Sequence, residues 1–250
     1  MRFPRVKDEG QGFYHCVSRV VDRQFIFQTA GHGSSEAERF VLLMRRLEAF
    51  SGVRVLTYAL MSNHFHLLCE VPQAQELSEA ELLERIQAGY GPARRQALEQ
   101  QLALLRQEPD GADQIQRLLQ PYRSRLFDIS IFVKELKGRF AQWYNRRHGR
   151  YGVLWAERFK SVLLEGGEAL AAVAAYIELN PVRAGLCADP KESLLWLCRG
   201  ARQGFLPGPP GYQNCSGPLR CHLLERSKPA VSEVPLCARK PEHQNQAACL

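Results

Sequence analysis

The sequence has no apolar run approaching the roughly 20 residues that a membrane-spanning helix requires, and its mean hydropathy is −0.29. Its first residues, MRFPRVKDEGQGFYH, contain no apolar core of the kind found in secretory signal peptides. We therefore expect neither a membrane protein nor an exported one. The sequence also lacks CxxC pairs, so the spacing of a zinc ribbon is absent. Its eight cysteines are expected to be free cytosolic thiols.

Motifs of several common enzyme classes are missing as well. Neither GxxxxGK[ST] nor GxGxxG occurs, so nothing in the sequence supports a nucleotide-dependent enzyme. GxSxG is also absent, which removes the support for a serine hydrolase. Positive charge is in excess, because 33 Lys and Arg face 26 Asp and Glu. The resulting net charge of +7 favours polyanionic partners.

The spacing of apolar residues predicts an α+β fold. The order strand, helix, strand, strand, helix, strand, helix predicts an antiparallel sheet packed on helices, and a ferredoxin-like arrangement fits this order. Asn180-Pro181 is expected to end the last helix. Strands are expected at 12–21, 53–60, 64–71 and, less regularly, 151–164; helices are expected at 35–51, from 129 to about 150, and at 168–179.

Composition divides the chain further. Residues 74–120 are rich in Gln, Glu and Leu and are expected to form a helical hairpin inserted in the domain. They carry eight acidic and five basic residues, whereas residues 121–165 carry four acidic and ten basic ones. This asymmetry suggests that the second segment faces an anion. We expect one domain over 1–195 and a poorly ordered tail over 196–250, where Gly, Pro, Gln and Cys follow no period.

The sharpest local feature is the pair His64 and His66 within a predicted strand. Alternate side chains share one face of a strand, so the two imidazoles point the same way, about 7 Å apart along it. Such a pair is a natural start for a divalent-metal site. The alternative is two hydrogen-bonded histidines on a half-exposed sheet, although an apolar run surrounds them.

Tyr176 is a second candidate, in the Ala-rich helix. It lies at the edge of the apolar stripe, and Asn180 follows one turn later. Its small neighbours would leave the hydroxyl accessible. Ordinary packing at the margin of the core is the alternative.

A mixture of basic and aromatic residues over 134–160 is the third feature. Charge that follows phosphates and rings that stack on bases suit single-stranded nucleic acid. The alternative is a solvated helix face with its aromatics in the core, where we place Phe140, Trp143 and Tyr144. Trp155 and Phe159 are expected to be more exposed. The residues predicted to bind DNA are Lys134, Lys137, Arg139, Arg146, Arg147, Arg150, Trp155, Arg158 and Lys160.

Several blocks, in the right order, resemble one family. YALMSNHFHLL resembles the metal motif of HUH-type single-tyrosine transposases. The run FVKELKGRFAQWYNRRHGRYGVLWAERFKSVLL and the block YIELNPVRAGL are similar to the REP-associated tyrosine transposase branch, as is the opening YHCVSRVVDRQFIF. The resemblance covers about residues 10–190, apart from 74–120. The Trp-Ser-Ser-Tyr-like segment usual after the Asn-Pro block is not recognisable here.

The resemblance implies a metal-dependent transposase or endonuclease that cuts and rejoins single-stranded, hairpin-flanked DNA. His64 and His66 match the metal ligands, for Mg²⁺ or Mn²⁺, and Asn180 matches a further polar ligand. Tyr176 matches the nucleophile that forms a 5′-phosphotyrosine link. It also implies a cytoplasmic, nucleoid-associated protein, a monomer or a homodimer. Two other functions stay open, namely a hairpin-binding relative without catalysis and a metal phosphoesterase that uses water.

Overall fold

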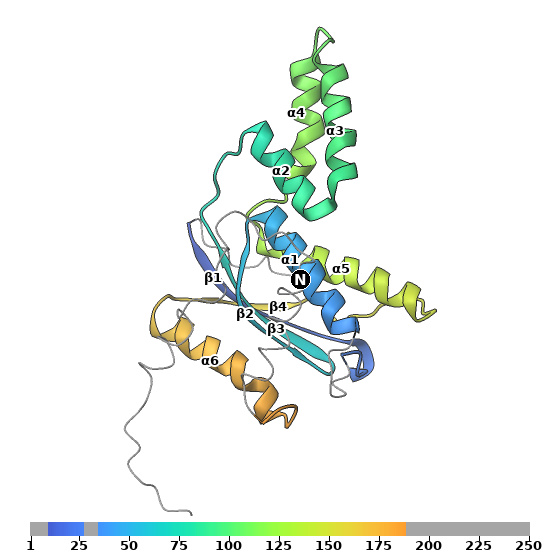
Figure 1. Cartoon of the computed structure of the whole chain (residues 1–250). Helices are drawn as coiled ribbons and strands as arrows, with labels where there is room; N and C mark the ends of the chain where they lie inside the picture. The colour runs from blue at the N-terminus through green and yellow to red at the C-terminus, as the bar shows by residue number, and fades with distance from the viewer. Residues whose placement is uncertain (1–9, 28–34, 189–250) are drawn as a thin grey trace, which may run out of the picture. The chain divides into compact units, whose positions relative to one another are not determined.

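The computed structural model describes residues 10–27 and 35–188 (Figure 1). Four strands, β1 (Gly12–Arg19), β2 (Arg54–Met61), β3 (His64–Val71) and β4 (Lys160–Leu164), form one antiparallel sheet in the order β2-β3-β1-β4. The predicted α+β class is therefore confirmed. Apart from the insertion α2 to α4 and the last helix α6, the strands and α-helices follow the βαββαβ order of ferredoxin-like folds. The predicted tail, 196–250, lies outside the described residues.

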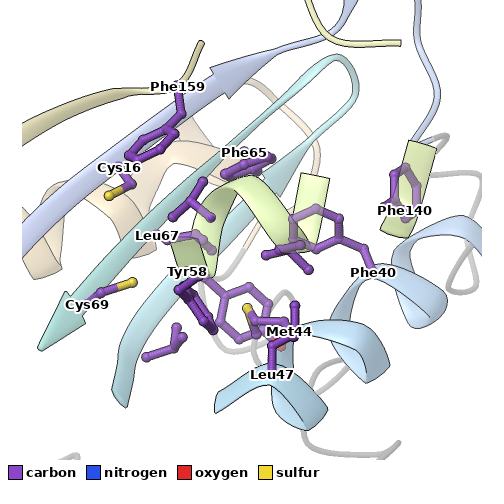
Figure 2. Close-up of a cluster of buried hydrophobic side chains, with 14 of the residues drawn as sticks. Cys16, Phe40, Met44, Leu47, Tyr58, Phe65, Leu67, Cys69, Phe140 and Phe159 are labelled. Atoms are coloured by element: carbon purple, nitrogen blue, oxygen red, sulfur yellow. The ribbon is translucent and has the colours of Figure 1, made fainter. Parts of the chain in front are cut away.

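One face of the sheet packs against α1 (Ser35–Ser51) and α5 (Ile129–Arg147). The helices form because their apolar residues recur every three or four positions, which gives each helix one apolar stripe. Buried aromatic rings fill the space between the layers; Phe40 lies 4.9 Å from Phe65 and 5.3 Å from Phe140, measured between ring centroids. Figure 2 shows these rings together with Cys16 and Leu67 of the sheet.

An irregularity in β2 changes which of its side chains face this core. The pairing with β3 shifts register between Val55 and Thr57, so Leu56 is a bulge residue, and its side chain is exposed. After the bulge, Tyr58 faces the helices α1 and α5, whereas Thr57 and Ala59 face the opposite side. The bulge therefore lets both faces of β2 keep apolar contacts along its length.

The opposite face is covered by α6 (Glu168–Arg183), as Figure 1 shows. Ile177 of α6 is fully buried against Ala59, Met61 and Leu68 of the sheet. The prediction that Asn180-Pro181 ends this helix is wrong, because α6 continues to Arg183. Pro181 lacks only the N–H that would reach the carbonyl of Ile177, close to the end of the helix. Its ring is buried, so packing holds one further turn.

The insertion contains three helices rather than the expected hairpin: α2 (Glu79–Tyr90), α3 (Pro92–Leu105) and α4 (Gly111–Arg123). Gly91 caps the end of α2 and directly precedes Pro92, the first residue of α3, and Asp110 is the N-cap of α4. The three helices share a second core with Phe50 of α1. Arg125 and Arg139 both pair with Glu135 of α5, and Tyr90 donates a hydrogen bond to the same carboxylate.

The extended segment predicted over 151–164 is a strand only at Lys160–Leu164. Residues 151–159 are irregular and join the sheet through one bridge, between Val20 and Trp155. The predicted free thiols are confirmed for Cys16 and Cys69. Among the described residues, no helix combines the length and the apolar character needed to cross a membrane.

Candidate active site

Three histidines meet on the sheet face that α6 partly covers. His64 and His66 lie on this face of β3, because Phe65 between them points into the opposite core. The central strand β1 adds His15. Val17 of β1 pairs with His66, and His15, two residues before Val17, has its side chain on the same face of the sheet. The ring centroids of His64 and His66 are 5.1 Å apart, and those of His15 and His66 are 5.2 Å apart. The predicted pair is therefore part of a cluster of three.

Both β3 histidines are held through their Nδ1 atoms. His64 Nδ1 lies 2.8 Å from Asn63 Oδ1, and His66 Nδ1 lies 3.0 Å from His15 Nε2. The Asn63 amide is oriented by its own Nδ2, which donates to the carbonyl of Arg23 at 3.3 Å. Neither Nε2 atom of the pair is bonded to a described residue or fully covered by one. The hydrogen bonds that hold the pair therefore leave both Nε2 atoms unbonded by described residues.

The environment of the cluster favours neutral imidazoles. Burial lowers the pKa of His66 to about 3, with additional repulsion from His64, His15 and Arg19. Burial also lowers the pKa of His15, and it lowers that of His64 together with the charge of Arg19. Neutral imidazole is the form that binds metal ions, so no proton has to be removed from the ring before coordination at neutral pH.

Tyr176 lies at the margin of α6, next to this cluster. Its side chain is 42% exposed, as its position on the edge of the apolar stripe predicts. Its ring centroid lies 5.8 Å from that of His66 and 6.3 Å from that of His15. The guanidinium carbon of Arg183, two turns further along α6, lies 5.9 Å from the same ring. The phenol is thus accessible, beside the histidines and close to a positive charge.

Asn180 lies one turn beyond Tyr176, but its side chain turns back along the helix. Its Nδ2 donates to the carbonyl of Tyr176 at 3.2 Å. Among the described residues, no group of three His, Cys, Asp or Glu is arranged to hold a metal ion. The donors in place are two imidazole nitrogens, which fit a divalent cation but leave most of its coordination positions to oxygen ligands.

The residues predicted to bind DNA differ in their exposure. Lys134, Arg146, Arg158 and Lys160 are exposed. Lys160 pairs across β1 Val17 with His66, so it lies in the same row of the sheet as the histidine. Arg150 is half-buried, with its guanidinium over Tyr144.

Three of the predicted DNA-binding residues are engaged in internal contacts. Lys137 is buried and donates to the carbonyl of Glu157 at 2.7 Å. Arg139 pairs with Glu135, and Arg147 lies 3.7 Å from the carboxylate of Glu36. Their positive charges are therefore partly satisfied within the fold.

The expected exposure of two aromatic residues is also not found. Phe159 is buried in the main core. Trp155 is half-buried with its ring 5.4 Å from that of Phe65, and its indole N–H donates to the carbonyl of Lys137. The bridge between Val20 and Trp155 holds the irregular segment 151–159 against the main core, and both aromatic rings pack there. Stacking of bases on Trp155 is therefore not supported.

A separate group of arginines lies where α1 meets α5. Arg39 and Arg46 are two turns apart on α1, and Arg146 comes from α5. The pKa of Arg39 is lowered by burial and by the charges of Arg46 and Arg146. Arg39 Nε is buried without a hydrogen-bond partner among the described residues. We refer to Arg39, Arg46 and Arg146 as the arginine cluster; its excess positive charge suits a phosphate.

No protein-family model matches the chain, and no curated protein matches it. Among solved structures, this chain is similar in fold to a REP-associated tyrosine transposase whose structure was solved bound to a REP hairpin. The TM-score is 0.47 and the sequence identity 12%, over 77% of this chain and 79% of that chain. The roles of individual residues therefore have to come from the geometry of this chain.

Sequence reasoning missed His15, Arg19 and Arg183 as members of the site. His15 is a polar residue in a predicted strand of mostly apolar residues, and the alternation of side chains places it on the face of the sheet opposite to Cys16. Its partner could not be identified, because the neighbours of β1 follow from the sheet order and not from the local sequence. Arg183 was missed because the helix was expected to end before it.

Proposed function

We propose that the chain is a metal-dependent enzyme that cleaves and rejoins single-stranded DNA, with Tyr176 as its nucleophile. The observation that carries the proposal is the position of the exposed Tyr176 phenol beside His66, whose ring in turn contacts that of His64. A tyrosine nucleophile close to histidines that can hold a divalent metal ion is suited to phosphoryl transfer. The resemblance of the separate sequence blocks to REP-associated tyrosine transposases supports the same chemistry.

The proposed step balances without a further reactant. The Tyr176 oxygen attacks the scissile phosphorus, a bond forms between them, and the bond from phosphorus to the 3′ oxygen breaks. The phenol proton leaves with the attack, and the 3′ oxygen gains one, which gives a 5′-phosphotyrosine and a free 3′-OH. Because one phosphodiester replaces another, the reverse attack by a 3′-OH rejoins the strand without ATP.

The residues around the phenol favour this attack. Positive charge close to the phenol favours the approach of an anionic phosphate. Arg183 supplies such a charge at 5.9 Å from the ring, and Lys160 and Arg19 lie on the same sheet face to neutralise phosphate. His64 and His66 would hold Mg²⁺ or Mn²⁺, which when bound polarises the scissile phosphate. Asn180 would complete the protein ligands after a rotation of its side chain.

The experiment is a denaturing gel of the purified chain with Mn²⁺ and hairpin-flanked single-stranded DNA from beside its own gene. The DNA is labelled at either its 3′ or its 5′ end. We expect a protein–DNA adduct that carries only the 3′ label, because the 5′-phosphate is the linked group. The adduct should disappear in Tyr176→Phe and persist in Tyr151→Phe, a matched control whose tyrosine is 96% exposed outside the site.

A second function is favoured by one observation, the inward turn of Asn180 onto its own helix. With two donors only, the chain could hold hairpin DNA through its basic residues and not cut it. That protein would bind the hairpin in a salt-sensitive manner and give neither adduct nor nicked DNA with Mn²⁺. Nicked DNA without any adduct would instead indicate attack by water, and an adduct that persists in Tyr176→Phe would refute our assignment.

A further inference from the structure

We propose that His15 is a positioning residue that keeps the proton of His66 on Nδ1 and so leaves the lone pair of Nε2 free. The inference rests on the proposed function, since a free Nε2 matters for a metal ligand. The contact that carries it is the 3.0 Å separation between His15 Nε2 and His66 Nδ1. One of these two nitrogens donates and the other accepts, so the bond determines the tautomer of both rings.

The other histidine of the pair shows which direction the bond takes. His64 Nδ1 faces Asn63 Oδ1, an acceptor, because Asn63 Nδ2 is used to donate to the carbonyl of Arg23. His64 therefore carries its proton on Nδ1 and has an unprotonated Nε2. His66 can act with His64 on one cation only in the same tautomer, with Nδ1–H donating to His15. The opposite direction would place a proton on His66 Nε2, and that nitrogen could not coordinate.

The position of His15 suits this role. It lies on the central strand β1, whose backbone pairs with β3 on one side and β4 on the other. Its ring stacks on that of His66 with an angle of 18° between the planes. Because the His15 side chain is half-exposed, its own Nδ1–H can bond to solvent. Both β3 histidines are thus oriented through Nδ1, one from the preceding residue and the other from a neighbouring strand.

Outer hydrogen bonds of this kind have a measurable effect. Removal of the group that orients a metal-binding histidine typically costs about 10- to 100-fold in metal affinity. We expect a loss of this size for Mn²⁺ in His15→Leu. In His15→Gln the side-chain carbonyl can still accept from Nδ1–H, so we expect most of the affinity to be retained. His148→Gln is the matched control, because His148 is exposed at the end of α5.

The experiment combines two measurements on the full chain. Ring ¹⁵N spectra of the metal-free protein report the tautomer of each histidine, and calorimetry with Mn²⁺ alone reports the affinity. We expect His66 to be protonated on Nδ1 in the wild type and in His15→Gln, and to lose this preference in His15→Leu. Circular dichroism of each variant shows whether the fold is retained, and His15→Gln decides the question if His15→Leu does not fold.

Three results would overturn the proposal. They are a proton on His66 Nε2 in the wild type, an unchanged tautomer in His15→Leu, and an unchanged Mn²⁺ affinity in that variant. A proposed function that fails gives a different pattern, in which the wild type binds no Mn²⁺ while the tautomers follow His15 as expected. In that case His15 still orients His66, and the metal site alone is refuted.

Discussion

The buried neutral state of His66 makes the stability of the chain depend on pH. The pKa of His66 is about 3 in the folded chain, against about 6.5 for an unperturbed histidine. Between these values the unfolded chain binds a proton that the folded chain does not, so the free energy of unfolding falls as the pH is lowered. The stabilisation is complete above pH 6.5. The shift corresponds to about 5 kcal/mol over the whole interval, and about 3 kcal/mol of it is lost by pH 4.

The assay is urea unfolding followed by circular dichroism at pH 7, 6, 5 and 4, for the wild type and His66→Gln. Glutamine keeps a polar side chain but does not titrate in this range. We expect the wild type to lose about 3 kcal/mol more than His66→Gln between pH 7 and pH 4. Parallel loss of stability in the wild type and His66→Gln would refute the reasoning.

Two further predictions concern other parts of the chain. If the arginine cluster contacts phosphates, a double variant with Arg46→Gln and Arg146→Gln should depend less on salt when it binds single-stranded DNA. The slope of log affinity against log salt concentration, measured by fluorescence anisotropy, should fall in magnitude by about 1.4. Arg95→Gln, whose arginine pairs with Glu99 in the insertion, should leave that slope unchanged, and equal slopes for all three proteins would count against the cluster. Gly52 has φ +77, and a Cβ there would lie 2.5 Å from Phe127 Cε1, so Gly52→Ala should cost about 2–4 kcal/mol of unfolding free energy. Gly138→Ala, at a helical position with open space, should instead stabilise the chain by about 0.5–1 kcal/mol, and a similar effect at both glycines would contradict this account.

Local patterns were sufficient for most of the sheet and for its helices. The strands predicted at 53–60 and 64–71 correspond closely to β2 and β3, because runs rich in β-branched, aromatic and other apolar residues favour strands. The end of α6 was not predictable from Pro181. Whether Pro181 stops the helix depends on whether the residue is buried. Its burial depends on the surface that α6 packs against and not on the neighbouring sequence.

The candidate site was predicted in part for the same reason. His64 and His66 belong to β3 and Tyr176 to α6, and the rings of His64 and Tyr176 lie 5.1 Å and 5.8 Å from that of His66, measured between centroids. The sequence could suggest each of these three residues. It could not suggest His15, because His15 lies 51 residues from His66 in the sequence and meets it only through the pairing of β1 with β3. The burial of Phe159 was not predicted, because an irregular segment lies over the core there and such a contact has no periodic signal.

The bulge at Leu56 has a consequence for the behaviour of the chain in concentrated solution. β2 is an outer strand of the sheet, and a flat outer strand offers unpaired backbone groups to a second molecule. The bulge interrupts that row, and on the opposite side β4 is only five residues long and begins with Lys160. Short length, a lysine and a bulge are the devices that prevent strand addition between molecules. A substitution that straightened β2 would therefore favour aggregation, even if the folded chain lost no stability.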